Sequence, residues 1–306
     1  MKNILIGCPY TGLTNIKRAI EESSNENIRI IITDQITRFS HKGLYLSNEF
    51  LPINDIHSSF VRYPFDLSPL HSSTFVDREK IEFYKSIALL VDSVGINSLK
   101  ETWALRKRAY SLSQIELFGA EVPDFWLSNT PDTKFIETDW MIKAIGNCYV
   151  SEKKEQLTRA QAKFINMEED EGKLVAFLFA SKLSPKEISK YAKAFSSYFT
   201  QRAVPNKHEY RCYYVSGQHF IYKKSASKDF DKSIAGYEAT SFTLDEKTRV
   251  AIEKLAETHN LKYLCLDVIA DYNDKNHVID INPYGTFPAY DYFPQPSKAI
   301  AKLLMS

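Results

Sequence analysis

The sequence predicts a mixed α/β (α+β) protein that begins with a parallel sheet and ends with an antiparallel one. Near the N-terminus, short apolar runs at residues 4–6 and 28–32 flank a segment with helical spacing, a β-α-β pattern typical of a parallel sheet. Towards the C-terminus, two pairs of strand-like runs are each joined by a short polar turn, which predicts two hairpins. The 306 residues suffice for one large unit or for two to three closely packed subdomains.

Helical and extended segments alternate through the first half of the chain. Residues 14–22 place Ile16, Ala19 and Ile20 on one face of a helix. A strand is expected to end near Pro64, and residues 78–91 and 102–118 have helical patterns, the second ended by Gly119 as a C-cap residue. Residues 140–145 form a predicted strand that carries Lys143, and the polar residues 150–174 predict a mobile loop.

The second half predicts both hairpins and two further helices. A strand is expected at 175–180 and helices at 185–199 and 244–260. The first hairpin joins residues 209–215 and 218–223 around Ser216 and Gly217. The second joins residues 263–270 and 277–281.

Composition argues against several classes of protein. Lys plus Arg is 39 and Asp plus Glu is 38, so no overall basic field favours binding to nucleic acid or to an anionic membrane. The four cysteines form no C-x-x-C pair, which argues against a zinc site and against a disulfide framework. No apolar run reaches the roughly 20 residues of a membrane helix, and the N-terminus does not resemble a signal peptide. We therefore expect a cytoplasmic protein.

The second hairpin carries a group of candidate metal ligands. Asp280 and Asn282 are two residues apart and share one face of a strand, while Ile279 and Ile281 are expected to point into the core. If the strands pair, Asp267 lies beside them. Two carboxylates and an amide oxygen are a ligand set suited to Mg²⁺ held together with phosphate oxygens. The alternative is that both aspartates are strand-end residues that accept hydrogen bonds from turn amides.

Five blocks of sequence, in order, resemble the ATP-grasp superfamily over roughly residues 97–306. The first runs from Arg106, Lys107 and Arg108 to a Gly-x-x-Val-Pro segment at 119–123. The second is the strand that carries Lys143. The remaining blocks are a strand, helix and hinge at 179–204, an acidic-x-Arg pair at 209–211, and the carboxylate group with Asn282-Pro283 and Gly285. Within the superfamily the chain looks most similar to graspetide (microviridin-type) peptide ligases and to ribosomal-protein glutamate ligases.

The resemblance implies ATP and Mg²⁺ as cofactors and assigns roles residue by residue. Lys143 and Arg211 would be catalytic and would contact phosphates, and Asp267, Asp280 and Asn282 would hold the metal. Glu209 would accept the ribose hydroxyls, although an exposed Glu-Arg pair is also typical of a cross-strand salt bridge. The nucleotide-binding set implied in this way is Arg108 (or its neighbour Lys107), Lys143, Gln201, Arg202, Val204, Glu209, Arg211 and Lys223. Arg62 stands where related ligases contact the substrate carboxylate, unless it is a strand-end residue without a ligand.

The implied fold is the ATP-grasp fold with three parts. Residues 1–98 would form an N-terminal parallel α/β domain, residues 99–199 a central lid subdomain, and residues 200–306 a C-terminal antiparallel-sheet subdomain with the metal site. The implied activity is ATP-dependent activation of a carboxylate as an acyl phosphate, followed by transfer to an amine or hydroxyl, with a peptide as substrate. Two alternatives stay open, a ligase of small molecules of the amino-acid type and a catalytically silent nucleotide-binding regulator. A homodimer also stays open.

Overall fold

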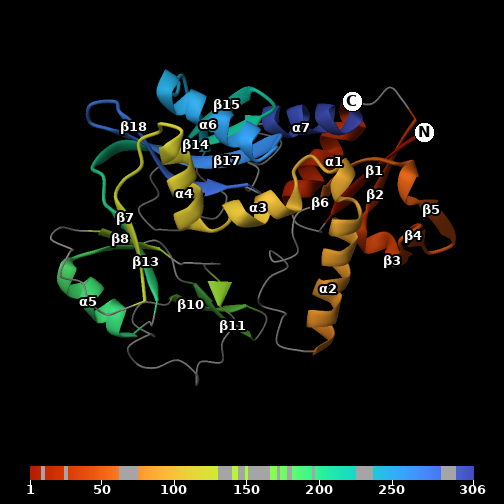
Figure 1. Cartoon of the computed structure of the whole chain (residues 1–306), viewed down its shortest axis with the longest axis horizontal. Coiled ribbons are helices and arrows are strands. Elements are labelled where there is room, and N and C mark those ends of the chain that lie inside the picture. Colours follow the sequence, from red (N-terminus) through yellow and green to blue (C-terminus); the bar gives the residue numbers. More distant parts are fainter. Residues whose placement is uncertain are drawn as a thin grey trace.

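The computed structural model describes residues 1–7, 11–23, 27–61, 75–129, 140–143, 149–150, 166–170, 173–177, 181–194, 197–224, 237–283 and 294–306. These residues form five sheets and the helices that cover them (Figure 1). The mixture of a parallel and several antiparallel sheets agrees with the predicted α/β (α+β) class.

The N-terminal sheet is parallel, as predicted. Its central strand β1 (Lys2–Gly7) pairs on one side with β2 (Ile28–Ile32) and on the other with β6 (Ile56–Val61). Helices α1 (Thr11–Ser23) and α7 (Gln295–Met305) lie side by side against this sheet, so the two ends of the chain pack together (Figure 1). Ile4, Ile16 and Ile300 are buried in the cluster that they share.

A small antiparallel sheet is inserted between β2 and β6, and the sequence did not predict it. It consists of β3 (Ile36–Ser40), β4 (Gly43–Leu46) and β5 (Glu49–Pro52). Its buried Leu44 packs with Leu5 of β1 and with Ile87 of α2 (Phe75–Leu90). The second face of the parallel sheet is covered in this way, as expected for parallel strands.

The helix predicted over residues 102–118 is two helices. They are α3 (Leu99–Leu105) and α4 (Arg108–Leu117), separated by Lys107, whose backbone is extended with φ −78° and ψ 99°. Neither proline nor glycine marks this break, and the helical spacing of apolar residues continues across it. The sequence pattern therefore predicted a single helix. Gly119 has φ 103° and ends α4 as predicted. The break places Arg108 in the first turn of α4.

The central part of the chain contains two antiparallel sheets. One has the order β12-β8-β13-β7 and the other β10-β11-β9. The predicted helix at 185–199 ends early, because α5 covers Pro185–Ala194 and the buried Tyr198 and Phe199 belong to a strand. The predicted loop at 150–174 contains β10. These strands are β7 (Phe125–Ser128), β8 (Trp140–Lys143), β9 (Tyr149–Val150), β10 (Asn166–Asp170), β11 (Lys173–Phe177), β12 (Ser181–Leu183) and β13 (Tyr198–Arg202).

The C-terminal sheet contains both predicted hairpins. The first joins β14 (Asn206–Val215) to β15 (Gln218–Lys224), with Ser216 at φ 44° and Gly217 at φ 86° as in a type I′ turn. The second joins β17 (Tyr263–Asp271) to β18 (Asn276–Asn282). With β16 (Tyr237–Ala239) the order is β16-β15-β14-β17-β18. Helices α4 and α6 (Glu246–Thr258) cover one face.

A register shift in the second hairpin corrects one expectation. Asp267 pairs with Asp280, whereas Val268 pairs with Val278, so Ile279 is an extra residue in β18. Ile281 and Val278 are buried against α4 and α6, but Ile279 is only half-buried and was wrongly expected in the core. The other face of the sheet carries Glu209, Arg211, Asp267, Ile269, Asp271, His277, Asp280 and Asn282, and we call it the open face.

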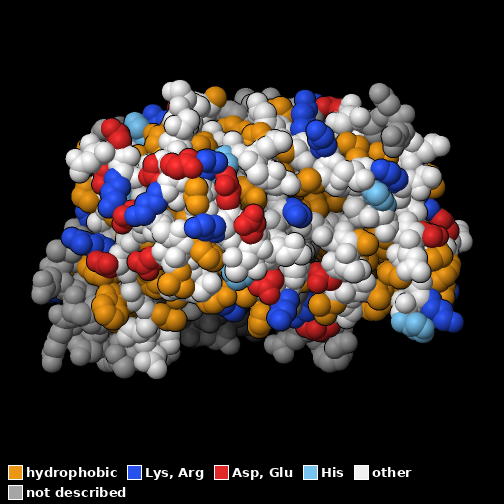
Figure 2. Space-filling view, turned by 45° about the horizontal axis from the view of Figure 1, so that its top comes forward, with side chains coloured by type: hydrophobic (Ala, Val, Ile, Leu, Met, Phe, Trp, Pro, Cys, Tyr) orange, Lys and Arg blue, Asp and Glu red, His pale blue; other side chains and the backbone are white. Residues whose placement is uncertain are grey.

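Charges are mixed on the molecular surface. Figure 2 shows basic and acidic side chains interspersed over one face of the molecule. Around α6, for example, Arg249 pairs with Glu246 and Glu253, and Lys247 pairs with Glu121. Across the described ranges, no helix is long and apolar enough to cross a membrane.

Candidate active site

Asp267 lies at the centre of a row of charged residues on the open face. The sheet register places it between Arg211 of β14 and Asp280 of β18. Three predicted site residues are therefore direct cross-strand neighbours. Asn282 follows Asp280 by two residues and shares its face.

Two cations bind the carboxylate of Asp267. Arg211 donates from Nε to Oδ1 at 2.8 Å and from Nη2 to Oδ2 at 3.0 Å, the fork geometry of a strong pair. Lys224 adds a second contact to Oδ2, at 2.9 Å from Nζ. Burial would raise the pKa of Asp267, but Arg211 and Lys224 outweigh burial and hold this pKa well below its usual range. Asp267 is therefore ionised at neutral pH.

Lys224 also pairs with Glu209, the predicted ribose ligand. The resemblance implied the neighbouring Lys223 as a nucleotide ligand instead. In the register of the hairpin, Lys223 lies opposite Tyr210, on the face that carries Cys212 and is covered by α6. The structure brings Lys224, rather than Lys223, to the charged cluster. The alternation of side chains along β15 could have indicated Lys224. This residue shares a face with Tyr222, which is the cross-strand partner of Arg211.

Asp280 is held by Arg108 from the first turn of α4. Arg108 Nε donates to Asp280 Oδ1 at 3.0 Å. Its neighbour Lys107 lies over the ring of Trp103 instead, 5.0 Å from the ring centroid. Of the two candidate residues, Arg108 is the one that reaches the site. Burial would raise the pKa of Asp280, yet Arg108 and Lys143 together keep this pKa below its usual value.

Lys143 of β8 links the central sheet to the C-terminal sheet. Its ammonium donates to Gln201 Oε1 at 2.7 Å and to the Ile279 carbonyl oxygen at 2.8 Å. The extra residue of β18 supplies that carbonyl. Gln201 is 1% exposed, and its Nε2 has no hydrogen-bond partner. A buried amide that lacks a partner is costly and calls for an explanation such as a ligand.

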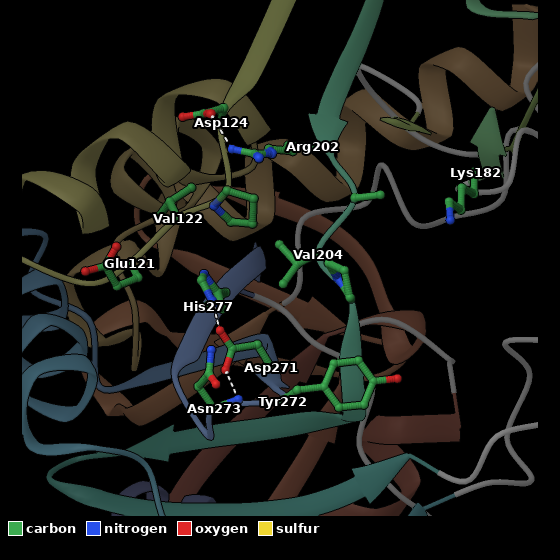
Figure 3. A pocket seen from close by; sticks show the side chains of 13 residues that line it. Glu121, Val122, Asp124, Lys182, Arg202, Val204, Asp271, Tyr272, Asn273 and His277 are labelled. Carbon is green, nitrogen blue, oxygen red and sulfur yellow. Dashed lines mark hydrogen bonds and ion pairs between the residues drawn. The ribbon is translucent and has the colours of Figure 1, made fainter. Parts of the chain in front are cut away.

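A cavity of about 840 Å³ lies beside the hinge between β13 and β14. The predicted adenine-binding residues Arg202 and Val204 line it, together with Val122, His277 and Tyr272 (Figure 3). Asp271 pairs with His277 at 3.2 Å and Arg202 with Asp124 at 3.6 Å. Its volume is within the range of small-ligand pockets. Among the residues that the structure describes, the other predicted nucleotide ligands do not line this cavity.

The cavity and the charged row lie on the same face of one sheet. Asp271 at the cavity and Asp267 in the row are four residues apart on β17, about 13 Å at the usual rise of a strand. An elongated ligand with a flat ring at one end and anionic groups at the other would match this arrangement. The hinge cavity offers apolar walls, and the charged row offers Arg108, Lys143, Arg211 and Lys224.

The predicted Mg²⁺ ligands fit the metal chemically. Asp267 and Asp280 are adjacent and both stay ionised, and Asn282 adds an amide oxygen on the same face. Hard oxygen donors of this kind suit Mg²⁺. Within the described part of the chain, no group of three or more His, Cys, Asp or Glu side chains that could hold a metal is found, so the predicted site rests on two carboxylates and an amide.

A Cys-His-Glu array between the first hairpin and α6 resembles a nucleophilic site but is inert. Cys212 Sγ lies 3.8 Å from His219 Nδ1, and His219 Nε2 lies 3.4 Å from Glu253 Oε1. Cys212 is fully buried, and burial raises its pKa far above the usual value. A buried thiol of this kind is a core residue. Arg62, the predicted contact of the substrate carboxylate, and Gly285 of the fifth block lie outside the described residues.

Comparison with known proteins identifies the fold. No protein-family model matches the chain, and no curated protein matches its sequence. Many solved structures match, among them three that match over nearly the whole length. The macrocyclase MdnC from Microcystis aeruginosa MRC, bound with its precursor peptide MdnA, is 17% identical with a TM-score of 0.72, covering 99% of each chain. A Chryseobacterium gregarium RiPP-associated ATP-grasp ligase, in complex with ADP and a leader and core peptide, is 16% identical with a TM-score of 0.74, covering 100% of this chain and 97% of that one.

The third structure is D-cycloserine synthetase DcsG, at 10% identity and a TM-score of 0.59, with 99% of each chain covered. The agreement in shape at low identity shows that the chain has the ATP-grasp fold, as the sequence predicted.

Proposed function

We propose that this ATP-grasp chain is an ATP-dependent carboxylate ligase that modifies a peptide. The observation that carries the proposal is the open face of the C-terminal sheet. It combines two ionised aspartates, four nearby cations and a hinge cavity about one nucleotide length away.

The nucleotide would lie along the open face. Its base would enter the cavity at the hinge, where Arg202 and Val204 lie, and its ribose would reach Glu209. The unpaired Nε2 of Gln201 is a hydrogen-bond donor available beside this path. The phosphates would extend towards Lys143, Arg108 and Arg211, whose fixed positive charges suit a charged transition state.

Mg²⁺ would be held by Asp267, Asp280 and Asn282 together with phosphate oxygens. The metal would supply neutralisation of phosphate charge. The cations that now pair with the two aspartates would be released towards the phosphates when these ligands bind.

The reaction that fits these groups is an ADP-forming ligation. A substrate carboxylate oxygen attacks the terminal phosphorus, the bond to the bridging oxygen breaks, and ADP leaves. An amine or hydroxyl then attacks the acyl carbon, and inorganic phosphate leaves with the electron pair of the broken bond. Lys143 and Arg211 would stabilise charge in the first step. Closure of the central part over the nucleotide would exclude water from the acyl phosphate.

A peptide is the proposed substrate because two solved structures of this shape contain peptides. MdnC is bound with a precursor peptide and the Chryseobacterium ligase with a leader and core peptide. D-cycloserine synthetase has the same fold, so a small-molecule carboxylate is the second candidate. A silent regulator is disfavoured, since Asp267, Asp280, Arg211 and Lys143 are all present and face one another.

The proposal includes the division of the chain into three parts, residues 1–98, 99–199 and 200–306. It also includes a cytoplasmic location. Light scattering tests whether the protein forms a homodimer.

Product analysis tests the proposed chemistry. We expect ADP and phosphate when the protein is incubated with ATP, Mg²⁺ and an acceptable peptide rich in Asp or Glu, and a peptide mass reduced by one water per bond. Hydroxylamine is expected to trap the acyl phosphate as a hydroxamate. Formation of AMP and pyrophosphate would contradict the mechanism, and turnover with amino acids but with no peptide would favour the small-molecule alternative.

A further inference from the structure

Lys224 is the one described side chain that contacts both a proposed metal ligand and the proposed ribose ligand. Its ammonium lies 2.9 Å from Asp267 Oδ2 and also pairs with Glu209 Oε1. The Glu209 side chain is 36% exposed, whereas those of Lys224 and Asp267 are 17% and 12% exposed, so the contact with Asp267 lies in a poorly solvated region. Ion pairs of this kind are much stronger than pairs on the surface.

Arg211 and Lys224 differ in how readily they could leave Asp267. Arg211 is fixed by two hydrogen bonds to the carboxylate and lies 5.3 Å from the ring centroid of Tyr237. Lys224 shares Oδ2 with Arg211, and it stands at the last residue of β15 on a flexible four-carbon stem. Its departure leaves Asp267 still paired with Arg211, whereas the departure of Arg211 would break the bidentate pair.

We propose that Lys224 is an internal cation that occupies the nucleotide site until ligands displace it, and that it thereby couples metal binding to ribose binding. The inference rests on the proposed function. When Lys224 leaves, Asp267 Oδ2 becomes available to a divalent cation and Glu209 becomes available to two hydroxyls. The first ligand to bind expels the ammonium, and the second binds to a site that is already open. The two ligands therefore favour each other.

The coupling can be measured without turnover and without phosphates. Mn²⁺ accepts the oxygen donors that suit Mg²⁺ and is counted by electron paramagnetic resonance. Adenosine presents a ribose but no phosphate that could bind the metal directly. For the wild-type protein we expect adenosine to tighten Mn²⁺ binding. For Lys224→Met we expect Mn²⁺ to bind at least about tenfold more tightly without adenosine, because one charge-assisted contact no longer competes. We further expect adenosine to have no added effect in this variant.

Two other variants serve as controls. Lys224→Arg keeps the competing charge and is expected to restore weak, adenosine-dependent Mn²⁺ binding. Lys254→Met removes a charge from an exposed position on α6 and is expected to bind Mn²⁺ as the wild type does. Circular dichroism establishes that each variant is folded.

The outcomes separate this inference from the proposed function. If the wild type binds Mn²⁺ and the folded variant Lys224→Met binds it equally well or more weakly, the proposed role of Lys224 is wrong. The ligase proposal would not be affected by this result. Weaker binding of ADP in Lys224→Met, without any gain for Mn²⁺, would make Lys224 a phosphate ligand instead. Failure of every variant to bind Mn²⁺ and ADP would overturn both proposals. If Lys224→Met does not fold, Lys224→Gln replaces it, with the same expected gain in Mn²⁺ affinity.

Discussion

Asp267 and Asp280 are direct neighbours across β17 and β18, yet each is neutralised by a cation from a different part of the fold. Arg211 of the same sheet holds Asp267, and Arg108 of helix α4 holds Asp280. Two adjacent carboxylates would otherwise repel each other, and one would take up a proton. Here both remain ionised, which is the state that a divalent cation requires.

Replacing Asp280 by Asn is expected to remove metal-dependent ATP turnover and to leave the fold intact. The amide keeps the shape of the side chain but lacks the charge that would bind Mg²⁺ and that now pairs with Arg108. ADP release in the presence of substrate measures the effect. Asp274→Asn is the matched control, since Asp274 lies in the β17–β18 turn at φ 60°, which Asn accepts. Wild-type turnover by Asp280→Asn would show that Asp280 is not a metal ligand.

Removing the charge of Lys143 is expected to weaken ATP binding by about 1.5–3 kcal/mol, the range for a hydrogen bond to a charged group. Lys143 joins the central sheet to β18 through hydrogen bonds to Gln201 and to the Ile279 carbonyl oxygen. Calorimetry with Lys143→Met measures the change, and Lys143→Arg tests whether charge alone restores affinity. Equal affinities for ATP in Lys143→Met and wild type would place the nucleotide elsewhere.

The paired aspartates Asp267 and Asp280 predict how stability depends on pH. The pKa values of Asp267 and Asp280 are lowered in the folded protein from an ordinary value of 3.8. Their contribution to the free energy of unfolding is therefore complete above this value and is lost as pH falls below it towards the folded-state pKa values. Asp267→Asn is expected to unfold more easily at pH 7, by about 3–5 kcal/mol, because Arg211 and Lys224 lose their partner.

Urea titrations at pH 7 and pH 3 measure this effect. The difference between the wild type and Asp267→Asn is expected to shrink at pH 3, where Asp267 begins to take up a proton on unfolding. A difference that stays constant between the two pH values would mean that the ionised carboxylate does not stabilise the fold.

Cys212 is expected to be dispensable for catalysis, despite its contact with His219. Its thiol is fully buried, and its pKa is raised by burial and by Cys265, so it cannot act as a thiolate nucleophile. Cys212→Ala should retain ligation of the peptide. Iodoacetamide should not label Cys212 in the folded protein and should label it once the protein is unfolded. Rapid labelling together with loss of turnover would instead indicate a covalent step on this residue.

Local patterns explain which features the sequence predicted. The two hairpins follow from alternation and from Ser216-Gly217, and the cluster of Asp267 and Asp280 follows from their places on paired strands. The break before Arg108 and the pairing of Lys143 with Gln201 depend on contacts between segments far apart in sequence, so no local pattern reveals them. Alternation along β15 places Lys224, and not the predicted Lys223, on the face that carries Arg211.

The extra residue at Ile279 has a consequence for how this protein can change. In an uninterrupted strand, Val278 and Asp280 would share a face, so one of them would be on the wrong side of the sheet. The site is therefore encoded partly in the length of β18 and only partly in its chemistry. The backbone carbonyl oxygen of residue 279 accepts a hydrogen bond from Lys143, a role that many side chains at this position permit. Substitutions at residue 279 would keep this acceptor, whereas a single-codon deletion would remove it and would leave Asp280 directly after Val278, in regular alternation and still on the open face.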